Sequence, residues 1–505
     1  MLEALRDPTS GHPSFGPARF DGASFTGSAR FDGAVFTDTV SFDGATFTHA
    51  ASFAGTVFAS LAAFNQTAFA FAAWFDRAVF TGAAAFGSAS FAGAANFRGA
   101  AFADAVQFPG AIFNRDVSFA GARFENAPWL GPLVCGGTVG LDSAVFEAPV
   151  TMMVSARELS LRRTRFGATA ALRLRHAEMD LAGAVLEHPV TVTAEQAPVN
   201  GPLDRPVPEE VLAAQDAGVR VRNLSGVDAA HLALTDVDLS ECRFAGAVHL
   251  DQLRMDGRTT FARPPTGWQH RGPVPLRWSR RRTLAEEHHW RAATGRLTPG
   301  QEPSLREWQP GPHHPDLLHL RGPETLAALY RQLRKALEDG KNEPGAADFY
   351  YGECEMRRYD RIGTPWTERV LLTAYWAMAG YGLRASRALA CLAAAMTATI
   401  AVMILWGVPA QASKQETIGR QVTAGQTLTL TTDSPDPVNP TSRWPERVTT
   451  ERFERSLRVV INSVIFRSSG QDLTTVGTYT EMASRLTEPL LLGLAVLAVR
   501  SRVKR

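Results

Sequence analysis

Phenylalanine recurs at a fixed interval through the first quarter of the chain. From Phe20 to Phe124 the rings fall alternately five and six residues apart, and all twenty positions of this series are Phe. Within that stretch only Phe71 lies off the register. The repeating unit therefore has eleven residues, F-x-G-A-x-F-x-x-x-A-x, with a small residue such as Ala23 or Ala45 two positions before each Phe. The series is Phe20, Phe25, Phe31, Phe36, Phe42, Phe47, Phe53, Phe58, Phe64, Phe69, Phe75, Phe80, Phe86, Phe91, Phe97, Phe102, Phe108, Phe113, Phe119 and Phe124.

An eleven-residue period can also belong to an amphipathic helix, which has ~3.67 residues per turn in that case. Two Phe five residues apart would then lie ~140° apart and share no helix face. In an extended segment, however, a residue and the one two before it point to the same side. A small residue and a Phe then both face inward, and stacked coils place Phe above Phe at ~4.8 Å. We therefore expect a β-solenoid over residues 15–125, with 22-residue coils.

This pattern resembles the pentapeptide-repeat family, whose unit is A-(D/N)-(L/F)-x-x. The resemblance implies a right-handed, four-sided β-helix with the central apolar residue of each unit pointing inward. The chain departs from the family in one respect, because every second unit has six residues instead of five. That extra residue at alternate corners makes the expected coil longer than one built from five-residue units alone.

A second, less regular solenoid is expected over residues 130–255. Leu141, Leu161 and Leu181 are spaced by 20 residues, which restores the ordinary coil length. Residues 197–217 contain four prolines and predict a loop that leaves the solenoid.

Residues 256–322 are polar and rich in Pro, Gly and Arg, and we expect a solvated linker there. The functional alternatives are anionic-lipid contact by the cluster Arg277–Arg282 and metal binding by the histidines. The histidine spacing fits no metal motif, so no metal site is predicted. The pair Glu286–Glu287, beside His288 and His289, is interpreted as the polar face of a short helix. The five histidines are His288, His289, His313, His314 and His319.

Residues 323–360 predict a helical hairpin with its turn at Asn342–Gly345. The first helix places an apolar stripe on one side. The second, Ala346–Arg358, is expected to turn Phe349, Tyr350 and Met356 inward. The stripe of the first helix is Leu326, Leu329, Tyr330, Leu333 and Leu337.

Residues 368–505 predict a membrane module. Residues 388–408 are 21 residues without a charge, long enough to cross ~30 Å of hydrocarbon. Val370–Leu383 suits an interfacial lead-in helix. We expect an outer region over 409–482, which contains the amphipathic helix Arg452–Phe466, and a second span at about 483–500.

Charges at the ends of these spans predict their orientation. Arg384 and Arg387 precede the first span, and a basic tail that ends in Lys504 and Arg505 follows the second. By the positive-inside rule both ends of the module are cytoplasmic. Met1–Ser14 has neither the basic nor the apolar region of a signal peptide. The sequence thus predicts a multi-pass protein of the inner (plasma) membrane with both termini in the cytoplasm.

The C-terminal part also resembles a group of bacterial, actinobacterial-like pentapeptide-repeat membrane proteins. There the repeats precede a helical hairpin like Leu329–Arg358, a lead-in like Gly380–Gly382 and a two-helix module similar to that of potassium channels. A potassium filter needs a T-x-G-Y-G-D-like run of carbonyl groups. At that place Phe466–Leu473 has a single glycine and a cation, Arg467. The string Thr475–Gly477 is interpreted as a chance match, so a degenerate and not potassium-selective pore is what the resemblance implies.

Composition and motifs narrow the function. The net charge is +2, and residues 12–125 hold eight acidic side chains and six arginines, so no DNA-like field and no nucleic-acid partner are expected. The four cysteines form no C-x-x-C pair and are expected to be reduced. No catalytic motif stands in a plausible context, so we predict no enzyme, no cofactor, and no catalytic, cofactor-binding or metal-binding residues.

Two functions remain. The first is a non-enzymatic interaction scaffold, in which the solenoid binds a cytoplasmic protein and the C-terminal module anchors it in the lipid bilayer. The alternative is an oligomeric ion-channel-like protein, for which a homo-oligomer would be the partner. The expected fold is a mainly β N-terminal half followed by an α-helical hairpin and two transmembrane helices.

Overall fold

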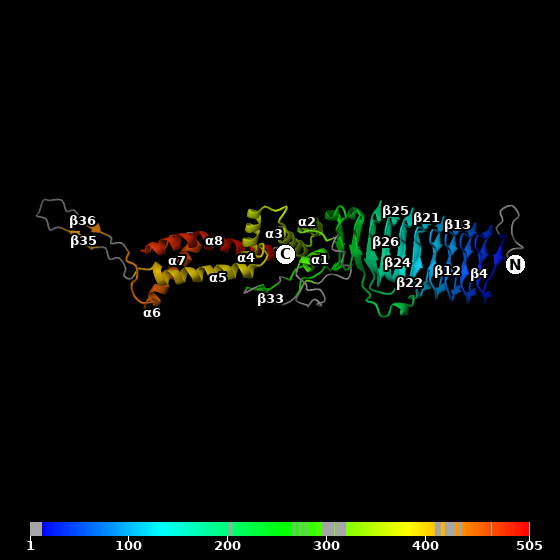
Figure 1. The fold of residues 1–505 in the computed structure, drawn as a ribbon, viewed down its shortest axis with the longest axis horizontal. Coiled ribbons are helices and arrows are strands. Elements are labelled where there is room, and N and C mark those ends of the chain that lie inside the picture. Colours follow the sequence, from blue (N-terminus) through cyan, green and yellow to red (C-terminus); the bar gives the residue numbers. More distant parts are fainter. Residues whose placement is uncertain are drawn as a thin grey trace. The chain divides into compact units, whose positions relative to one another are not determined.

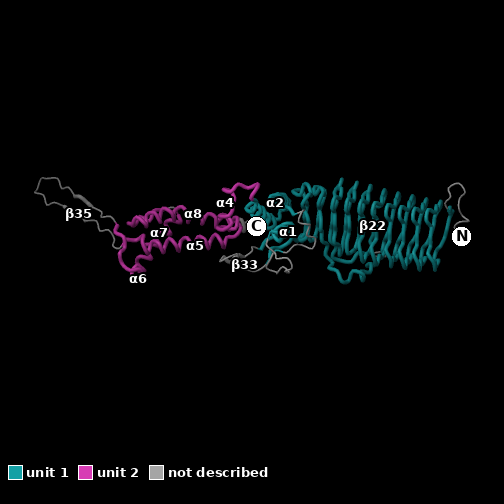
Figure 2. Tube along the Cα trace, in the orientation of Figure 1, with its two compact units in different colours: residues 1–360 teal, residues 361–505 magenta. Residues whose placement is uncertain are grey.

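The chain divides into two compact units, Met1–Asp360 and Arg361–Arg505 (Figure 2). The computed structural model describes residues 13–200, 205–265, 268–271, 274–277, 280–294, 308, 320–409, 416–419, 430–433, 437–465 and 467–503.

The first unit begins with a four-sided solenoid whose short parallel strands stack as rungs (Figure 1). One face is a nine-stranded sheet and the next a five-stranded sheet. The nine are β1 (Ser14–Phe15), β5 (Val35–Phe36), β9 (Val57–Phe58), β13 (Val79–Phe80), β17 (Ala101–Phe102), β21 (Arg123–Phe124), β23 (Val145–Phe146), β25 (Arg165–Phe166) and β28 (Val185–Leu186). The five are β2 (Ala18–Arg19), β6 (Val40–Ser41), β10 (Ala62–Ala63), β14 (Ala84–Ala85) and β18 (Val106–Gln107).

The two other faces form one sheet, because two long strands, β22 (Trp129–Gly140) and β24 (Val150–Ser160), run through both. The third face also holds β3 (Ser24–Phe25), β7 (Thr46–Phe47), β11 (Ala68–Phe69), β15 (Ser90–Phe91), β19 (Ala111–Phe113), β26 (Ala170–Arg175), β29 (Val190–Ala194), β31 (Leu232–Thr235) and β32 (Arg254–Asp256). The fourth, which we call the β12 face, also holds β4 (Ala29–Arg30), β8 (Ala51–Ser52), β12 (Ala73–Trp74), β16 (Ala95–Asn96), β20 (Val117–Ser118), β27 (Glu178–Asp180) and β30 (Arg220–Asn223).

The strand register confirms the coil lengths predicted from the sequence. Phe47 pairs with Phe69 and Phe69 with Phe91, so each ring stacks on the fourth ring after it and a coil holds two complete eleven-residue units. On the nine-stranded face after β23, Phe146 pairs with Phe166 and Phe166 with Leu186, which is the shorter coil of the ordinary family unit. The first rung differs, because Phe15 pairs with Phe36 and that coil is one residue shorter than its successors.

Stacked rings form the solenoid core. Phe47 and Phe69, in successive coils, lie 4.9 Å apart between ring centroids with their planes 1° apart. Rings from different faces meet edge-on, as Phe64 and Phe75 do at 5.5 Å and 89°. Both arrangements suit the quadrupole of an aromatic ring. Each fully buried Phe contributes ~2 kcal/mol from area alone, so the column dominates the stability of the rod.

The five-residue steps contain a tight turn with a residue in the left-handed region. Gly44 occupies this place with φ 68°, and its neighbour Ala45 donates its N–H to the Phe42 carbonyl at 2.9 Å. Glycine adopts this conformation without the cost that a Cβ imposes. Arg77 takes the same conformation with φ 52° in a later coil, so glycine is favoured at this corner but not required.

The predicted excursion is present as a long interval between β29 and β31, where Val190 pairs with Leu232. It includes the 3₁₀ turn η3 (Glu210–Leu212). Val207 and Leu212 of the excursion pack against Val134 on the third face. The excursion thus covers part of the solenoid surface.

A helical cap closes the C-terminal end of the solenoid. It comprises α1 (Ala285–Thr294), α2 (Pro323–Asp339) and α3 (Glu343–Tyr359), and the stripe predicted for α2 is buried in the same core as the solenoid. The turn was predicted at Asn342–Gly345, which is too far along the chain. Asn342 caps α3 by accepting the Gly345 N–H at 3.1 Å, so the helix begins at Glu343. Unit 1 also has the 3₁₀ turns η4 (Ala229–His231) and η5 (Leu250–Gln252) and the hairpin β33 (Trp268–Arg271) and β34 (Val274–Arg277).

The second unit is helical. Its elements are α4 (Trp366–Ala379), α5 (Ala385–Val402), the π-turn η7 (Met403–Gly407), the hairpin β35 (Glu416–Gly419) and β36 (Leu430–Asp433), α6 (Trp444–Arg447), α7 (Thr450–Val464) and α8 (Thr475–Val503). Two segments are long and apolar enough to cross a membrane, Ala385–Gly407 and Thr475–Arg500.

Two predicted boundaries in this unit were wrong. The lead-in helix ends at Ala379, because Gly380 stops it with a left-handed φ of 53°. The last helix begins at Thr475 and not near 483, since Thr474 accepts the Gly477 N–H at 3.2 Å and starts the helix there.

Replacement of a core ring should cost far more than replacement of the off-register ring in the same coil. We expect Phe75→Ala to destabilise the solenoid by ~3–5 kcal/mol, because it leaves a cavity in the stacked column. Phe71→Ala removes the same atoms from the surface and should change stability by less than ~0.5 kcal/mol. Denaturant unfolding of the full chain, followed by the β-sheet circular dichroism signal, measures both. Equal losses would contradict the assignment of the core.

Candidate interaction surface of the solenoid

The β12 face has one outward-facing position per coil, and each of these except Gly140 carries a side chain. Strand alternation explains this, because Ala73 points into the core and Trp74 points out. Most members of the column are small or polar, and Trp74 is its one aromatic residue. The column is Arg30, Ser52, Trp74, Asn96, Ser118, Gly140, Ser160, Asp180 and Asn223.

Two large aromatic side chains are exposed at the edge of this face. Phe71 lies at the corner before β12 and is 57% exposed, and Trp74 is 39% exposed. His49, in the neighbouring coil, stacks on Phe71 with ring centroids 5.9 Å apart. Gly93 follows in the next coil, and a Cβ there would lie 2.4 Å from the Phe71 backbone. Glycine is therefore needed at 93, and that coil adds no side chain beside the ring.

A shallow depression of about 260 Å³ adjoins Trp74. Arg98 and Asp116 give it charges of both signs, and its remaining lining is small. Burial raises the pKa of Asp76, next to this site, even though Arg98 and Arg77 oppose the effect. The lining residues are Trp74, Ala94, Ala95, Asn96, Arg98, Asp116 and Ser118.

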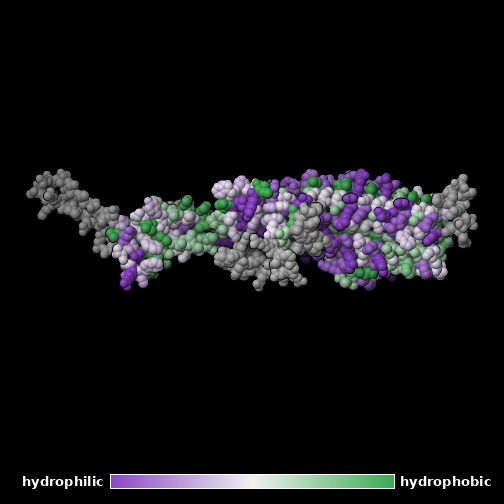
Figure 3. All heavy atoms as spheres, in the orientation of Figure 1, coloured by the Kyte–Doolittle hydropathy of each residue, from purple (hydrophilic) through white to green (hydrophobic). Residues whose placement is uncertain are grey.

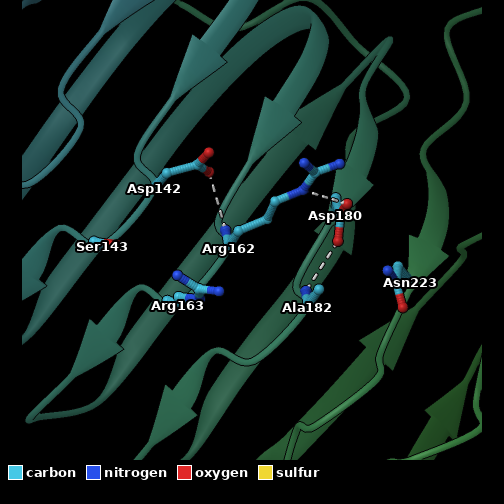
Figure 4. Close-up of a pocket in the computed structure, with 7 residues that line it drawn as sticks. All are labelled: Asp142, Ser143, Arg162, Arg163, Asp180, Ala182 and Asn223. Atoms are coloured by element: carbon cyan, nitrogen blue, oxygen red, sulfur yellow. Dashed lines mark hydrogen bonds and ion pairs between the residues drawn. The ribbon is translucent and has the colours of Figure 1, made fainter.

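A larger depression of about 440 Å³ lies further along the same face (Figure 4). Arg162 connects two coils, because its Nε donates to Asp180 at 2.7 Å while its backbone N–H donates to Asp142 at 3.2 Å. The Arg162 side chain is largely exposed, so the ion pair itself contributes little to stability. The depression is lined by Asp142, Ser143, Arg162, Arg163, Asp180, Ala182 and Asn223.

The β12 face is thus suited to recognition and carries no arranged catalytic group. Its two depressions are mixed in charge, and the smaller one lies beside an exposed aromatic pair. Aromatic anchors surrounded by polar contacts are typical of protein-binding surfaces.

A serine, a histidine and a carboxylate do meet beneath the excursion, although no sequence motif indicates it. Glu209 accepts from Ser155 Oγ at 2.7 Å and from His176 Nε2 at 3.3 Å. Ser155 donates to the carboxylate and not to the imidazole, and it is fully buried. A nucleophile needs its hydroxyl beside the base, so this cluster fastens the excursion to the solenoid and has no catalytic geometry.

Glu286 and Glu287 do lie on a short helix, α1, but their interpretation as its polar face was wrong, because both side chains are buried. Glu287 is fully buried, and Arg281 donates to its two oxygens at 2.5 and 2.7 Å. Arg291 donates to it at 2.7 Å, and the Tyr330 hydroxyl also donates to it. Glu286 accepts the backbone N–H groups of the last coil from Phe244 at 2.5 Å and Ala245 at 3.1 Å.

The prediction of a solvated linker was wrong for residues 281–294, because they belong to this buried network. These residues hold the cap to the solenoid, so Arg281 is not available to a lipid surface. Burial raises the pKa of Glu287, but Arg281 and Arg291 outweigh it and bring the value down to about 2. Burial lowers the pKa of His288 to about 4, and its Nε2 lies 2.9 Å from Thr283 Oγ1.

The other candidate residues remain separate. Within the described part of the chain, no three His, Cys, Asp or Glu side chains come together as a metal site. His313, His314 and His319 lie outside the described residues. Thr475–Gly477 forms the first turn of α8, and Gly477 there packs against Gly407.

Comparison with known proteins identifies the repeat. Residues 15–57 match the family model for pentapeptide repeats (9 copies). No curated protein matches the chain. No solved structure matches it either. The chain therefore contains pentapeptide repeats within a β-solenoid, and it has two helices apolar enough to span a membrane.

Removal of the Glu287 charge should destabilise the cap strongly. Glu287→Gln removes the buried carboxylate that Arg281 and Arg291 share, although Arg291 also pairs with Glu355 at 3.4 Å, and we expect a loss of ~3–5 kcal/mol. The control is Glu338→Gln on α2, an exposed partner of Arg334 at 3.7 Å, which should cost ~0–1 kcal/mol.

The same network predicts an acid dependence. The folded-state pKa of Glu287 lies below its usual 4.5, so its stabilisation is present above pH 4.5 and is lost as the pH falls toward about 2. Denaturant unfolding at pH 7 and at pH 3 measures this, and Glu287→Gln should reduce the difference between the two. An unchanged difference would exclude Glu287 as its source.

Proposed function

We propose that this chain is a membrane-anchored scaffold whose solenoid binds a protein partner through the β12 face. The observation that carries the proposal is the exposure of Phe71 and Trp74 on a face otherwise built from small and polar residues. Every other Phe in the stretch from Phe31 to Phe124 is buried. An exposed ring pair beside one polar depression, with a second further along the same face, supplies the anchor and the rim that protein interfaces use.

The helical unit supports the membrane part of the proposal. Its large apolar side chains face outward and several polar ones face inward, the reverse of a water-soluble bundle. Green and pale residues cover much of the α5–α8 region in Figure 3. The exposed set is Leu389, Trp406, Phe453, Ile461, Ile465, Val476, Tyr479, Met482, Leu486, Leu490, Val496, Leu497 and Val499. The buried polar set is Thr399, Ser456, Ser463, Thr474, Glu481, Ser484 and Glu488.

At the end of the first span, side chains donate hydrogen bonds to backbone carbonyls. The π-turn leaves backbone carbonyls without helical donors. Arg452 donates to the carbonyls of Ile404 at 2.8 Å and Val408 at 2.7 Å. Thr474 Oγ1 donates to the Trp406 carbonyl at 2.6 Å. Such satisfaction of backbone groups is what a membrane-spanning helix requires at its end.

We also propose that both ends of the membrane module face the cytoplasm. Arg384 and Arg387 lie at the start of α5, and Arg500 lies near the end of α8. The loop before α7 would then be outside. The positive-inside rule supports this orientation in the inner or plasma membrane.

An oligomeric, channel-like protein is the second candidate. It is favoured by the order of α5, α7 and α8, in which the short α7 packs against both long helices. The segment after α7 folds back on α8, because Ser469 donates its N–H to Glu481 at 2.8 Å. Planar-bilayer recording of the purified chain decides between the two, since a scaffold gives no conductance.

The scaffold proposal predicts a contact at Trp74 that is absent on another face of the same coil. A photo-crosslinking amino acid at 74 should capture a partner in native membranes, and Phe71→Ser should reduce that adduct. The matched control is position 79, because Val79 is also exposed but belongs to the nine-stranded face. Equal adducts at 74 and 79, or none at 74, would contradict the proposed surface.

The proposed orientation predicts which engineered cysteines are accessible. The thiols of Cys135 and Cys354 react slowly, since burial raises the pKa of Cys135 to about 12 and that of Cys354 to about 11. We expect Ser442→Cys, before α7, to react with an impermeant maleimide added outside intact cells. Ser28→Cys, an exposed solenoid position, should react only after permeabilisation. The reverse result would invert the orientation.

A further inference from the structure

Apart from Pro489, the buried residues of α8 are separated alternately by four and by three residues. This spacing is that of a helix-pair seam, in which each residue meets the neighbouring helices. Gly477 meets Gly407, and Ser484 Oγ lies 2.9 Å from Ser463 Oγ on α7. The seam is Gly477, Glu481, Ser484, Glu488, Leu491, Ala495 and Ala498.

Glu488 lies in the middle of this seam and is 0% exposed. Its Oε1 is 2.9 Å from Thr399 Oγ1 on α5, and its Oε2 is buried without a hydrogen-bond partner. An ionised carboxylate in such a place would be an uncompensated charge, which is costly within a protein and more so within a membrane.

The elements around Glu488 supply no cation to it. The part of α5 from Ala388 to Val402 contains no charged residue, and its titratable Cys391 is only partly buried. The buried face of α7 consists of Ser456, Val459, Val460 and Ser463. On α8 itself, the nearest arginine is Arg485, which donates to Glu481 at 2.8 Å.

The hydrogen-bond partners of Glu488 are compatible with a proton on its carboxyl group. The Thr399 hydroxyl has one hydrogen and lies within reach of two acceptors, Glu488 Oε1 at 2.9 Å and the Ala395 carbonyl at 3.0 Å. A carbonyl oxygen can only accept. If Thr399 donates to Ala395, the Glu488 carboxyl must be the donor to Thr399 Oγ1. The resulting chain, Glu488 to Thr399 to Ala395, leaves no buried charge, and only Glu488 Oε2 stays without a hydrogen-bond partner.

Glu481, one heptad earlier in the same seam, provides the contrast. It accepts from the Ser469 N–H at 2.8 Å and from Arg485 at 2.8 Å. Both partners are N–H donors and one is cationic, so this carboxyl has the surroundings of a carboxylate. The two acids of the seam therefore differ in their donors although they share a helix face.

We propose that Glu488 is a proton-binding site within the membrane-embedded helices and that it holds its proton at neutral pH. The inference rests on the membrane part of the proposed function. Pro489 follows the site directly and cannot donate a helical hydrogen bond to the Arg485 carbonyl. The proton thus sits where α8 lacks one of its backbone bonds and where the helix bends most easily.

A hydrophobic carbodiimide tests the proposal. The carboxylic acid adds across one C=N bond of the reagent, so that the proton goes to a nitrogen and the carboxyl oxygen to the central carbon. The adduct rearranges to a stable N-acylurea, and nothing is released. A glutamate in water ionises near pH ~4.3 and is not a substrate for this addition at pH 7.

Full-length protein in native membranes is treated with dicyclohexylcarbodiimide at pH 7, and its peptides are analysed by mass spectrometry. We expect the adduct at Glu488 and its loss in Glu488→Gln. Glu481→Gln, the matched control in the same seam, should leave the adduct in place. A water-soluble carbodiimide should label Glu488 much less. Thr399→Ser keeps the hydroxyl and should preserve the labelling.

An infrared measurement keeps the proposal testable if a variant folds poorly. The wild-type chain in membranes should show the C=O stretch of a protonated carboxyl at pH 7, without any substitution. Absence of this band together with absence of the adduct would overturn the proposal. Extraction of the protein by alkaline carbonate would instead refute the membrane anchor, so the two failures can be told apart.

Discussion

The need to keep a regular series of aromatic rings out of water determines most of this structure. Each strand of the solenoid is only two or three residues long through the Phe-rich coils, so no single strand pair could hold the fold together. The rings stack at centroid distances near 4.9 Å and make one continuous core instead. Because that core uses only the inward positions, the outward positions are free to vary. The β12 face can therefore carry Trp74 and two polar depressions without cost to the fold.

The sequence predicted the solenoid in detail because every ring occupies an equivalent place. Identical residues at a fixed interval specify the coil length, and the shortening of the coil could be read from the step between Leu141 and Leu161. The same reasoning could not predict the arrangement of exposed residues on the β12 face. Only Phe71 signalled it, as the one ring outside the register, and its exposure depends on Gly93 in the next coil.

The polar clusters could not be predicted because their partners are distant in the chain. Glu287 has the sequence surroundings of a solvated helix, yet it is buried against Tyr330, which lies on another helix. Glu209 meets Ser155 only because the excursion folds back over the third face. The sequence gives the identity of a polar residue, but it does not show which distant group will be its hydrogen-bond partner. Such groups become buried where a complete set of partners offsets the loss of hydration.

The two apolar helices also differ in how well the sequence predicted them. The first could be recognised from the sequence since it contains no charge between Ala388 and Val408. The start of the second was misplaced because Glu481, Arg485 and Glu488 interrupt its apolar run. Two of these, Glu481 and Glu488, fall on the seam, and Arg485 pairs with the first of them. Average hydropathy counts all three residues as breaks in a membrane span. The spacing of Glu481 and Glu488 places both on the buried seam instead, so the outer surface of α8 remains apolar. The period of the polar residues, and not their number, therefore decides whether such a helix can lie in a membrane.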